Sequence, residues 1–278
     1  MSKVWFVTGS SRGLGRAIVT AALQAGDRVV ATARRPAQLD DLVERYGDRI
    51  RALALDVTDD DAVQRTVQEG LKAFGRYDVV VNNAGYADLA SVEDVTLEDF
   101  RAQIDTNFYG VVHVSKAVTP ILREQGSGHI FQVSSLGGRI TSAGLTAYQS
   151  AKWAVGGFSL GLAQEVAPFG VKVTVLQPGG MRTDWAGSSM KVPPVSEPYQ
   201  QTVGTFADMI RNADPEAAAA DSADPARVAE IIVDLAGRDD APTQILLGRD
   251  ALQYWDQAAQ ALAESDARWR GVSESAWG

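Results

Sequence analysis

A tyrosine and a lysine four residues apart form the pair in this chain best suited to moving a proton. Tyr148 and Lys152 lie in a segment whose apolar spacing predicts a helix over 146–167, so both side chains share one helix face. A free tyrosine has a pKa of about 10, and a nearby ammonium group lowers that pKa; lowering it by about 3 units requires about 4 kcal/mol. We therefore expect Tyr148 to be a general acid and base toward a carbonyl or hydroxyl oxygen. A solvated helix face without chemistry is the alternative.

Three glycines between the first predicted strand and the first predicted helix form a second candidate site. The segment 8–15 has the spacing T-G-x-x-x-G-x-G. Gly9 permits a tight turn, Gly13 lets the backbone approach a pyrophosphate, and Gly15 lets the helix pack on the strand. The helix N-terminus then presents free N–H groups and a positive dipole end to the phosphates. The loop predicts a dinucleotide site, with a tight turn that binds nothing as the alternative.

The end of the second predicted strand bears on which nicotinamide dinucleotide would bind. An acid there binds the ribose 2′-OH of NAD, whereas an arginine accommodates the 2′-phosphate of NADP. Here Ala33 replaces the acid, Arg34 and Arg35 follow it, and Arg12 in the glycine loop adds another cation. Cations at a helix start oppose the helix dipole, which favours a ligand role over a surface role. We predict NADP(H) as the cofactor, and NAD(H) is the alternative.

These residues lie at the ends of strands in a chain that alternates strands with helices. Short apolar runs predict seven strands, at 3–8, 28–33, 50–54, 77–82, 129–134, 171–177 and 244–247. Helices are predicted at 14–25, from Pro36 to 46, from an N-cap at Thr58 or Asp59, and at 97–124, 146–167, 225–237 and 250–268. Strands that are apolar on both faces and alternate with helices indicate a parallel sheet covered on both sides.

The expected fold is a single-domain α/β doubly wound Rossmann fold spanning 1–278. Its seven-stranded sheet is expected to be mostly parallel, with helices on both faces. We expect a cofactor half over 1–125 and a catalytic and substrate half over 126–278. The long stretch 183–223, rich in proline and alanine, is interpreted as an irregular lid over the site.

Composition excludes several classes of function. The net charge is −9, so the surface repels phosphate backbones and no nucleic-acid partner is expected. The chain has no cysteine, which excludes disulfides and thiolate chemistry. We interpret the two histidines, His113 and His129, as structural. With no cysteine and no histidine available as a ligand, no metal site is predicted. The chain start lacks a signal-peptide pattern and no run approaches the ~20 apolar residues of a membrane span. We expect a cytoplasmic protein without a membrane partner.

Taken together, the motifs resemble those of the classical short-chain dehydrogenase/reductase family. The glycine loop has that family's spacing, and Asp56 lies in a DVTD segment that resembles its adenine contact. The segment Asn82-Asn83-Ala84-Gly85 follows the fourth strand, and Pro178-Gly179 follows the sixth. Tyr148 and Lys152 stand in the family's Y-x-x-x-K motif. The resemblance runs from about residue 3 to 183, and more loosely through the seventh strand.

The resemblance implies a set of site residues. The implied catalytic residues are Asn107, Ser135, Tyr148 and Lys152, where the family's spacing to the tyrosine selects Ser135 over Ser134. The implied cofactor-binding residues are Gly9, Ser11, Arg12, Gly13, Leu14, Gly15, Arg34, Arg35, Asp56, Val57, Asn83, Ala84, Gly85, Tyr148, Lys152, Pro178, Gly179, Met181 and Thr183. Met181 departs from the family's commoner pattern of a β-branched residue after the glycine.

The resemblance also implies a role for each catalytic residue. Tyr148 would give a proton to a carbonyl oxygen in reduction or take one from a hydroxyl in oxidation, and Ser135 would hydrogen-bond the same oxygen. Lys152 would also hold the nicotinamide ribose. Asn107 would bind a water that passes protons from Lys152 to solvent, and a buried structural amide is the alternative reading of this residue.

The predicted function is hydride transfer between NADP(H) and a ketone or secondary alcohol, as in a ketoreductase or alcohol dehydrogenase. The alternatives are an NAD-dependent alcohol dehydrogenase of the same family and a non-catalytic NADP-binding regulator. The expected substrate residues are Tyr86, Ser135, Leu136, Leu145 and Trp185, whose mainly apolar character indicates a hydrophobic skeleton and selects no particular substrate.

Helices 97–124 and 146–167 resemble the family's paired-helix surface, which implies a homodimer or homotetramer.

Overall fold

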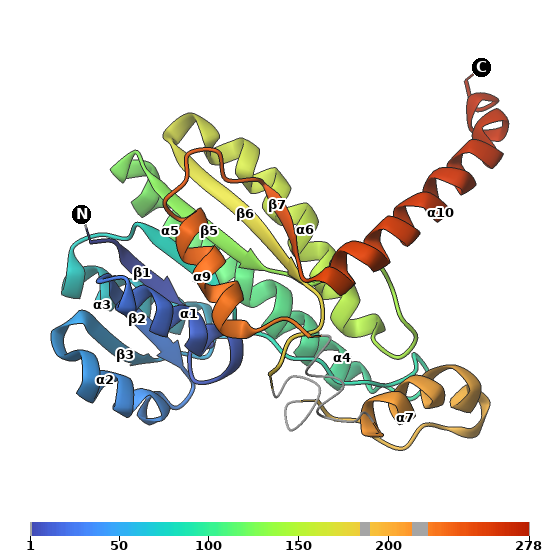
Figure 1. Cartoon of the computed structure of the whole chain (residues 1–278), viewed down its shortest axis with the longest axis horizontal. Coiled ribbons are helices and arrows are strands. Elements are labelled where there is room, and N and C mark those ends of the chain that lie inside the picture. Colours follow the sequence, from blue (N-terminus) through green and yellow to red (C-terminus); the bar gives the residue numbers. More distant parts are fainter. Residues whose placement is uncertain (1, 184–189, 213–221, 278) are drawn as a thin grey trace.

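The computed structural model describes residues 2–183, 190–212 and 222–277, and its centre is one sheet (Figure 1). The strand order is β3-β2-β1-β4-β5-β6-β7, and every neighbouring pair is parallel. The strands are β1 (Val4–Val7), β2 (Arg28–Ala33), β3 (Ile50–Ala54), β4 (Val79–Asn82), β5 (Gly128–Val133), β6 (Val171–Pro178) and β7 (Gln244–Leu247). The prediction of seven strands is confirmed, and the sheet is parallel throughout, not mostly parallel.

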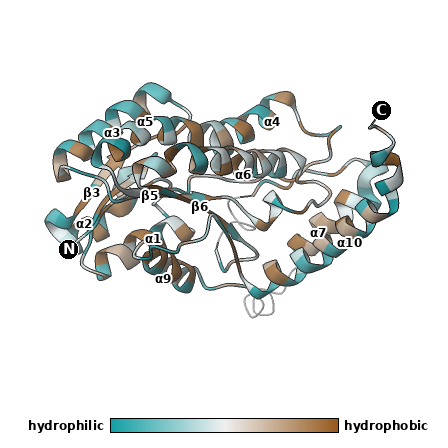
Figure 2. Cartoon of the chain, turned by 90° about the horizontal axis from the view of Figure 1, so that it is seen from above, coloured by the Kyte–Doolittle hydropathy of each residue, from teal (hydrophilic) through white to brown (hydrophobic). Residues whose placement is uncertain are grey.

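Helices connect the strands and cover both faces of the sheet, as Figure 2 shows from above. They are α1 (Gly13–Gln24), α2 (Asp40–Tyr46), α3 (Asp60–Phe74), α4 (Leu97–Ile104), α5 (Gly110–Gln125), α6 (Thr146–Val166), α7 (Thr205–Arg211), α9 (Pro225–Leu235) and α10 (Arg249–Glu274). The helix expected from Pro36 begins as a 3-10 turn, Pro36–Leu39, before α2. Asp59 caps α3 by accepting a hydrogen bond from the amide of Ala62.

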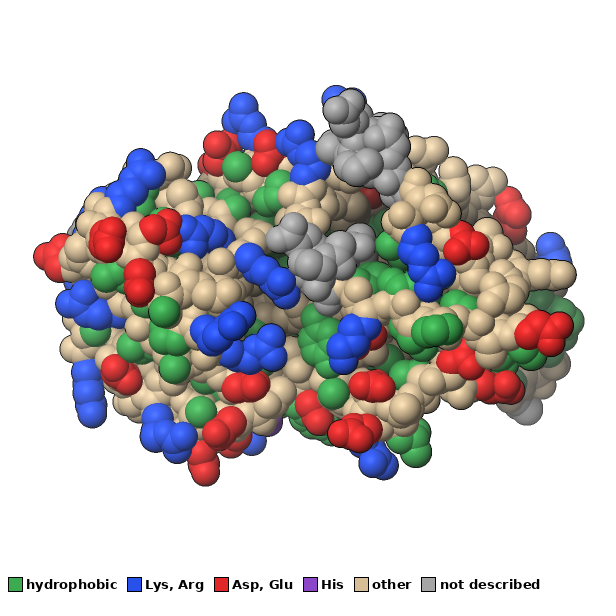
Figure 3. Space-filling view, turned by 90° about the horizontal axis from the view of Figure 1, so that it is seen from below, with side chains coloured by type: hydrophobic (Ala, Val, Ile, Leu, Met, Phe, Trp, Pro, Cys, Tyr) green, Lys and Arg blue, Asp and Glu red, His purple; other side chains and the backbone are tan. Residues whose placement is uncertain are grey.

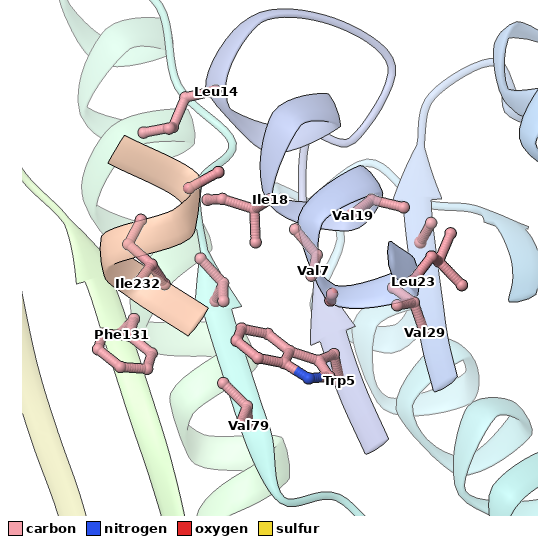
Figure 4. Close-up of a cluster of buried hydrophobic side chains, with 14 of the residues drawn as sticks. Trp5, Val7, Leu14, Ile18, Val19, Leu23, Val29, Val79, Phe131 and Ile232 are labelled. Carbon is pink, nitrogen blue, oxygen red and sulfur yellow. The ribbon is translucent and has the colours of Figure 1, made fainter. Parts of the chain in front are cut away.

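Each face of the sheet has its own apolar core. On one face, α1 and α9 pack over the strands, and Trp5, Ile18 and Ile232 are fully buried there (Figure 4). On the other face, α3, α5 and α6 cover the next residue of β1, Phe6, together with its neighbours. Successive side chains of a strand point to opposite faces. Both faces are covered, which explains why β1 is apolar at every position.

The helix expected over 97–124 is interrupted. A π-helical turn, Asp105–Tyr109, separates α4 from α5. It places Asn107 fully inside the protein, where the side-chain amide bonds to the backbone of Tyr86 and of Gln103. A single extra residue in one turn leaves the apolar spacing on either side nearly unchanged, so periodicity does not reveal it. Such turns frequently mark functional sites.

The segment expected to be an irregular lid, 183–223, contains regular structure where it is described. A 3-10 turn (Glu197–Tyr199) and a π-helical turn (Gln200–Gly204) lead into α7. Buried side chains of this segment pack with Tyr148 in a third apolar cluster. The expectation of an irregular connection is therefore wrong for 197–211, and 184–189 and 213–221 lie outside the described residues.

The last helix, α10, starts against the sheet and then projects from the body (Figure 1). It extends beyond the expected 250–268. Ala251 in its first turn is buried, whereas every residue from 260 to 277 is exposed. Neither α10 nor any other helix within 2–183, 190–212 and 222–277 is long and apolar enough to cross a membrane.

Candidate active site

A cavity of about 1220 Å³ opens at the carboxyl ends of the strands. The strand order reverses between β1 and β4, which is where doubly wound folds bind ligands. Among the expected site residues, those lining the cavity are Gly9, Ser11, Arg12, Gly13, Leu14, Gly15, Arg34, Asp56, Val57, Asn83, Ala84, Gly85, Tyr86, Asn107, Ser135, Leu136, Leu145, Tyr148, Lys152, Pro178, Gly179, Met181 and Thr183. Arg35, the residue before the Pro36–Leu39 turn, does not line it, and Trp185 lies outside the described residues.

The glycine loop is held tightly against the loop after β4. Gly9 has a φ of 66°, and a Cβ there would lie 2.8 Å from the backbone of Ala84. A Cβ on Gly15 would lie 2.3 Å from the carbonyl oxygen of Gly9, so helix and loop approach as only glycine allows. The Asn83 side chain donates hydrogen bonds to the carbonyls of Thr8 and Gly9. The predicted turn and close packing are both present.

Two arginines face the cavity at the glycine-loop end. Arg12 precedes α1 and Arg34 follows β2; both are exposed and both line the cavity. Among the described residues no carboxylate forms an ion pair with either guanidinium. Lys and Arg side chains gather around the hollow in the face seen in Figure 3. This end of the cavity is suited to an anion.

Tyr148, Ser135 and Lys152 meet at the other end of the cavity. The Ser135 hydroxyl hydrogen-bonds the Tyr148 phenol, and its oxygen accepts the amide of Gly137 at 3.0 Å. The Lys152 Nζ lies 5.6 Å from the centroid of the Tyr148 ring and donates to the carbonyl of Val133 at 2.8 Å. Ser134 instead donates to the carbonyl of Lys152, a contact within the core. The geometry therefore supports Ser135 over Ser134.

Lys152 alone does not lower the pKa of Tyr148 in this structure. Burial raises the pKa of Tyr148 to about 12, and the hydrogen bond with Ser135 only partly opposes the rise. Burial also lowers the pKa of Lys152 to about 8, because the low-dielectric interior disfavours the ammonium form. Desolvation by burial is the largest cause of both shifts.

The side chain of Asn107 is fully engaged with protein. Its amide nitrogen donates to the carbonyls of Tyr86 and Gln103, and its oxygen accepts the Tyr86 amide at 3.1 Å. A Cβ on Gly85 would lie 2.5 Å from that oxygen and 3.4 Å from the Lys152 Nζ, so Asn107 and Lys152 approach one another beside Gly85. These contacts hold the Tyr86 segment along the cavity wall.

Several cavity residues carry no signal in the sequence. Asp250 and Tyr254 come from the first turns of α10, and Gln149 follows Tyr148 on α6. Asp250 accepts the amide of Gly180 at 2.6 Å and so joins α10 to the loop after β6. Only the folded chain brings the α10 residues to the site.

Arg139 does not line the cavity. Its guanidinium hydrogen-bonds the side chains of two glutamines, Gln177 and Gln244.

Both histidines make internal contacts. His113 hydrogen-bonds the carbonyl of Val57, and His129 hydrogen-bonds the hydroxyl of Thr174. Burial lowers the pKa of His129 to about 3. Within the described part of the chain, no three His, Asp or Glu side chains are grouped so that they could hold a metal ion.

The parallel sheet, the glycine loop at its switch point and the Ser–Tyr–Lys group define a dinucleotide-dependent oxidoreductase of Rossmann type. Residues 3–192 match the sequence profile described as short chain dehydrogenase. The chain belongs to the short-chain dehydrogenase family.

Individual relatives agree with this assignment. Oxidoreductase BOA17 of Botryotinia fuckeliana is 58% identical over 274 residues, covering 98% of each chain. A crystal structure of a short-chain dehydrogenase from Streptomyces avermitilis is 36% identical, with a TM-score of 0.92 over 99% of this chain and 98% of that one. The alcohol dehydrogenase of Thermococcus sibiricus, complexed with 5-hydroxy-NADP, is 26% identical with a TM-score of 0.73 over 89% of this chain and 97% of that one.

Proposed function

We propose that this protein is an NADP(H)-dependent reductase of ketones, or the corresponding alcohol dehydrogenase, with Tyr148 as the general acid and base. The observation that carries the proposal is the placement of the Ser135–Tyr148 hydrogen bond and Lys152 in the same cavity as the glycine loop and the two arginines. A proton donor and an anion site joined by one cavity suit hydride transfer from a dinucleotide to a carbonyl.

The chain's residues fit a nicotinamide dinucleotide. The first residues of α1 line the cavity, and a helix N-terminus offers free backbone N–H groups to a phosphate. Gly13 is open there, since among the described residues a Cβ would meet only Thr183, at 3.7 Å. The loop after β6, with Gly179 and Gly180, borders the Tyr148 end. The bound cofactor would supply or accept the hydride. Arg12 and Arg34 would hold its 2′-phosphate.

The proton chemistry belongs to the chain itself. With its pKa near 12, Tyr148 is protonated at neutral pH and is ready to donate to a substrate carbonyl oxygen. Ser135 would hydrogen-bond that same oxygen as negative charge develops on it. Lys152, whose pKa burial lowers to about 8, would return a proton to the phenol. Asn107 would position the Tyr86 segment beside this group.

Absorbance at the nicotinamide band tests the proposal directly. The purified protein is mixed with NADPH or NADH and a panel of ketones, and the reverse reaction is followed with alcohols and the oxidised cofactors. The expected result is ketone-dependent loss of NADPH, with a much smaller rate with NADH. Binding of either cofactor without turnover of any panel member would favour a non-catalytic regulator.

A further inference from the structure

Gln149 has a side-chain donor beside the candidate catalytic group for which the described residues provide no acceptor. It follows Tyr148 on α6, is 4% exposed and lines the same cavity. Its Oε1 accepts the backbone amide of Ser142 at 3.0 Å. A backbone N–H only donates, so this contact fixes which end of the side-chain amide is oxygen. The Nε2 group therefore points the other way, and no acceptor for it lies among residues 2–183, 190–212 and 222–277.

The unused donor lies close to the hydroxyl that would bind the reacting carbonyl. The point where a Cβ on Gly137 would lie is 3.5 Å from the Gln149 Nε2 and 3.4 Å from the Ser135 Oγ. The two atoms therefore lie within about 7 Å of each other, a separation that two oxygens of one small molecule can span with hydrogen bonds of about 2.9 Å. The Nε2 atom is not among the fully buried atoms without a partner, so an acceptor on a ligand would replace water there.

We infer that Gln149 is a specificity-determining residue for carbonyl substrates that carry a second oxygen acceptor two or three bonds from the reacting carbon, such as β-keto esters and β-diketones. The reacting oxygen binds Ser135 and Tyr148, while the second oxygen accepts from the Gln149 Nε2. This inference rests on the proposed function and adds a substrate class to it. Plain ketones offer this donor no acceptor, so they lack the net contribution of one hydrogen bond.

Matched ketones test the inference. Ethyl acetoacetate is compared with 2-heptanone, and ethyl benzoylacetate with hexanophenone; each pair has the same chain length and differs in the ester group. The ester also makes the ketone more electrophilic. The measured quantity is therefore the ester-to-ketone ratio, which is kcat/KM for the keto ester divided by kcat/KM for the matched ketone. This ratio is compared between the wild type and the variants.

Two substitutions separate the donor from the structural contact. Gln149→Glu keeps an oxygen for the Ser142 amide and removes the Nε2 donor, whereas Gln149→Met removes both. A neutral hydrogen bond of about 0.5–1.5 kcal/mol predicts that either variant lowers the ester-to-ketone ratio about 2-fold to 12-fold, mainly through KM of the ester. Gln164→Glu, an exposed position on the same helix, is the control and keeps the wild-type ratio.

The outcomes distinguish this inference from the function on which it rests. If both Gln149 variants slow both members of a pair equally, Gln149 is only structural and the inference is overturned while the reductase remains. If the wild-type protein reduces none of the four ketones and no other member of the panel, the proposed function itself has failed and the inference falls with it. A lower ratio in both variants, with the control unchanged, supports the inference.

Discussion

Burial moves the pKa values of Tyr148 and Lys152 farther apart than they are in water. The pKa of the phenol rises to about 12 and that of the ammonium falls to about 8, in both cases because burial disfavours the charged form. At neutral pH the tyrosine therefore carries the proton that a carbonyl reduction consumes. The resting state of the site favours proton donation over proton abstraction.

Replacing Tyr148 by phenylalanine tests whether this proton is used. The ring keeps its place among the apolar residues of the third cluster, while the hydroxyl that bonds Ser135 is lost. We expect turnover to fall roughly 100-fold or more, on the scale of general acid–base catalysis, with cofactor affinity retained. Rate measurements at saturating cofactor check this, and turnover at the wild-type level would remove Tyr148 from the mechanism.

The lowered pKa of Lys152 makes a prediction about stability. Its pKa is about 8 in the folded chain and about 10.4 when unfolded, so between these values the unfolded state binds more protons and stability rises with pH. Below pH 8 the full cost of burying the ammonium is present. We expect wild type to gain stability relative to Lys152→Met as pH rises from 7 to 10.5. Chemical denaturation across that range measures the difference, and parallel curves would contradict it.

We expect the preference for NADPH over NADH to depend on Arg34 and on the small residue before it, Ala33. Charge-assisted hydrogen bonds contribute about 1.5–3 kcal/mol, so Arg34→Ala should weaken NADPH binding about 10-fold to 150-fold and leave NADH nearly unchanged. Ala33→Asp should act in the same direction, because the carboxylate repels the 2′-phosphate and can accept from a ribose hydroxyl. Titration with both reduced cofactors is the measurement. Equal wild-type affinities would show that these arginines are surface charges.

Among the elements, those built from continuous patterns could be predicted and those built from single-residue adjustments could not. Strands such as β1 could be predicted because every residue is apolar. The glycine loop could be predicted because its spacing of glycines is typical of one backbone conformation. The π-helical turn at Asn107 inserts one residue without changing the pattern around it. Asp250 and Tyr254 reach the site only through the placement of α10, and the free donor of Gln149 depends on which backbone amide its oxygen meets.

The two parts of α10 should differ in their contribution to stability. Trp255 near its start lies under the Arg139 guanidinium, 4.8 Å from the ring centroid, whereas every residue from 260 to 277 is exposed. A chain ending at Ala259 should therefore keep its melting temperature within about 2 °C, since surface residues contribute little. Trp255→Ala should lower it measurably through lost packing and a cation–π contact of about 0.5–2 kcal/mol. A large loss on truncation would mean that the projecting helix packs against another chain.

At the scale of the whole molecule, the site is assembled at one edge of the sheet from nearly the full length of the chain. Loops after β1, β2, β3 and β4 line the glycine-loop side, and the loops after β5 and β6 together with α7 and α10 line the other. The doubly wound order brings these loops together because parallel strands end at the same edge. Exposed side chains on the outer side of these helices, such as Trp153 on α6, do not line the cavity and are available for contacts between chains.

Self-association through the outer face of α5 and α6 is the expectation at this scale. Tyr109, Trp153 and Phe169 are each at least 44% exposed on or beside these helices, and large exposed aromatics are typical anchors of protein interfaces. Light scattering should give a mass two or four times 29.7 kDa. In a symmetric dimer each substitution acts twice, so Trp153→Asp should shift the protein toward the monomer. Trp269→Asp, at a 58% exposed tryptophan on the projecting part of α10, is the control and should leave the mass unchanged. If Trp269→Asp gives the monomer and Trp153→Asp does not, the interface lies on α10. A wild-type protein that is monomeric at all concentrations would exclude an interface on either surface.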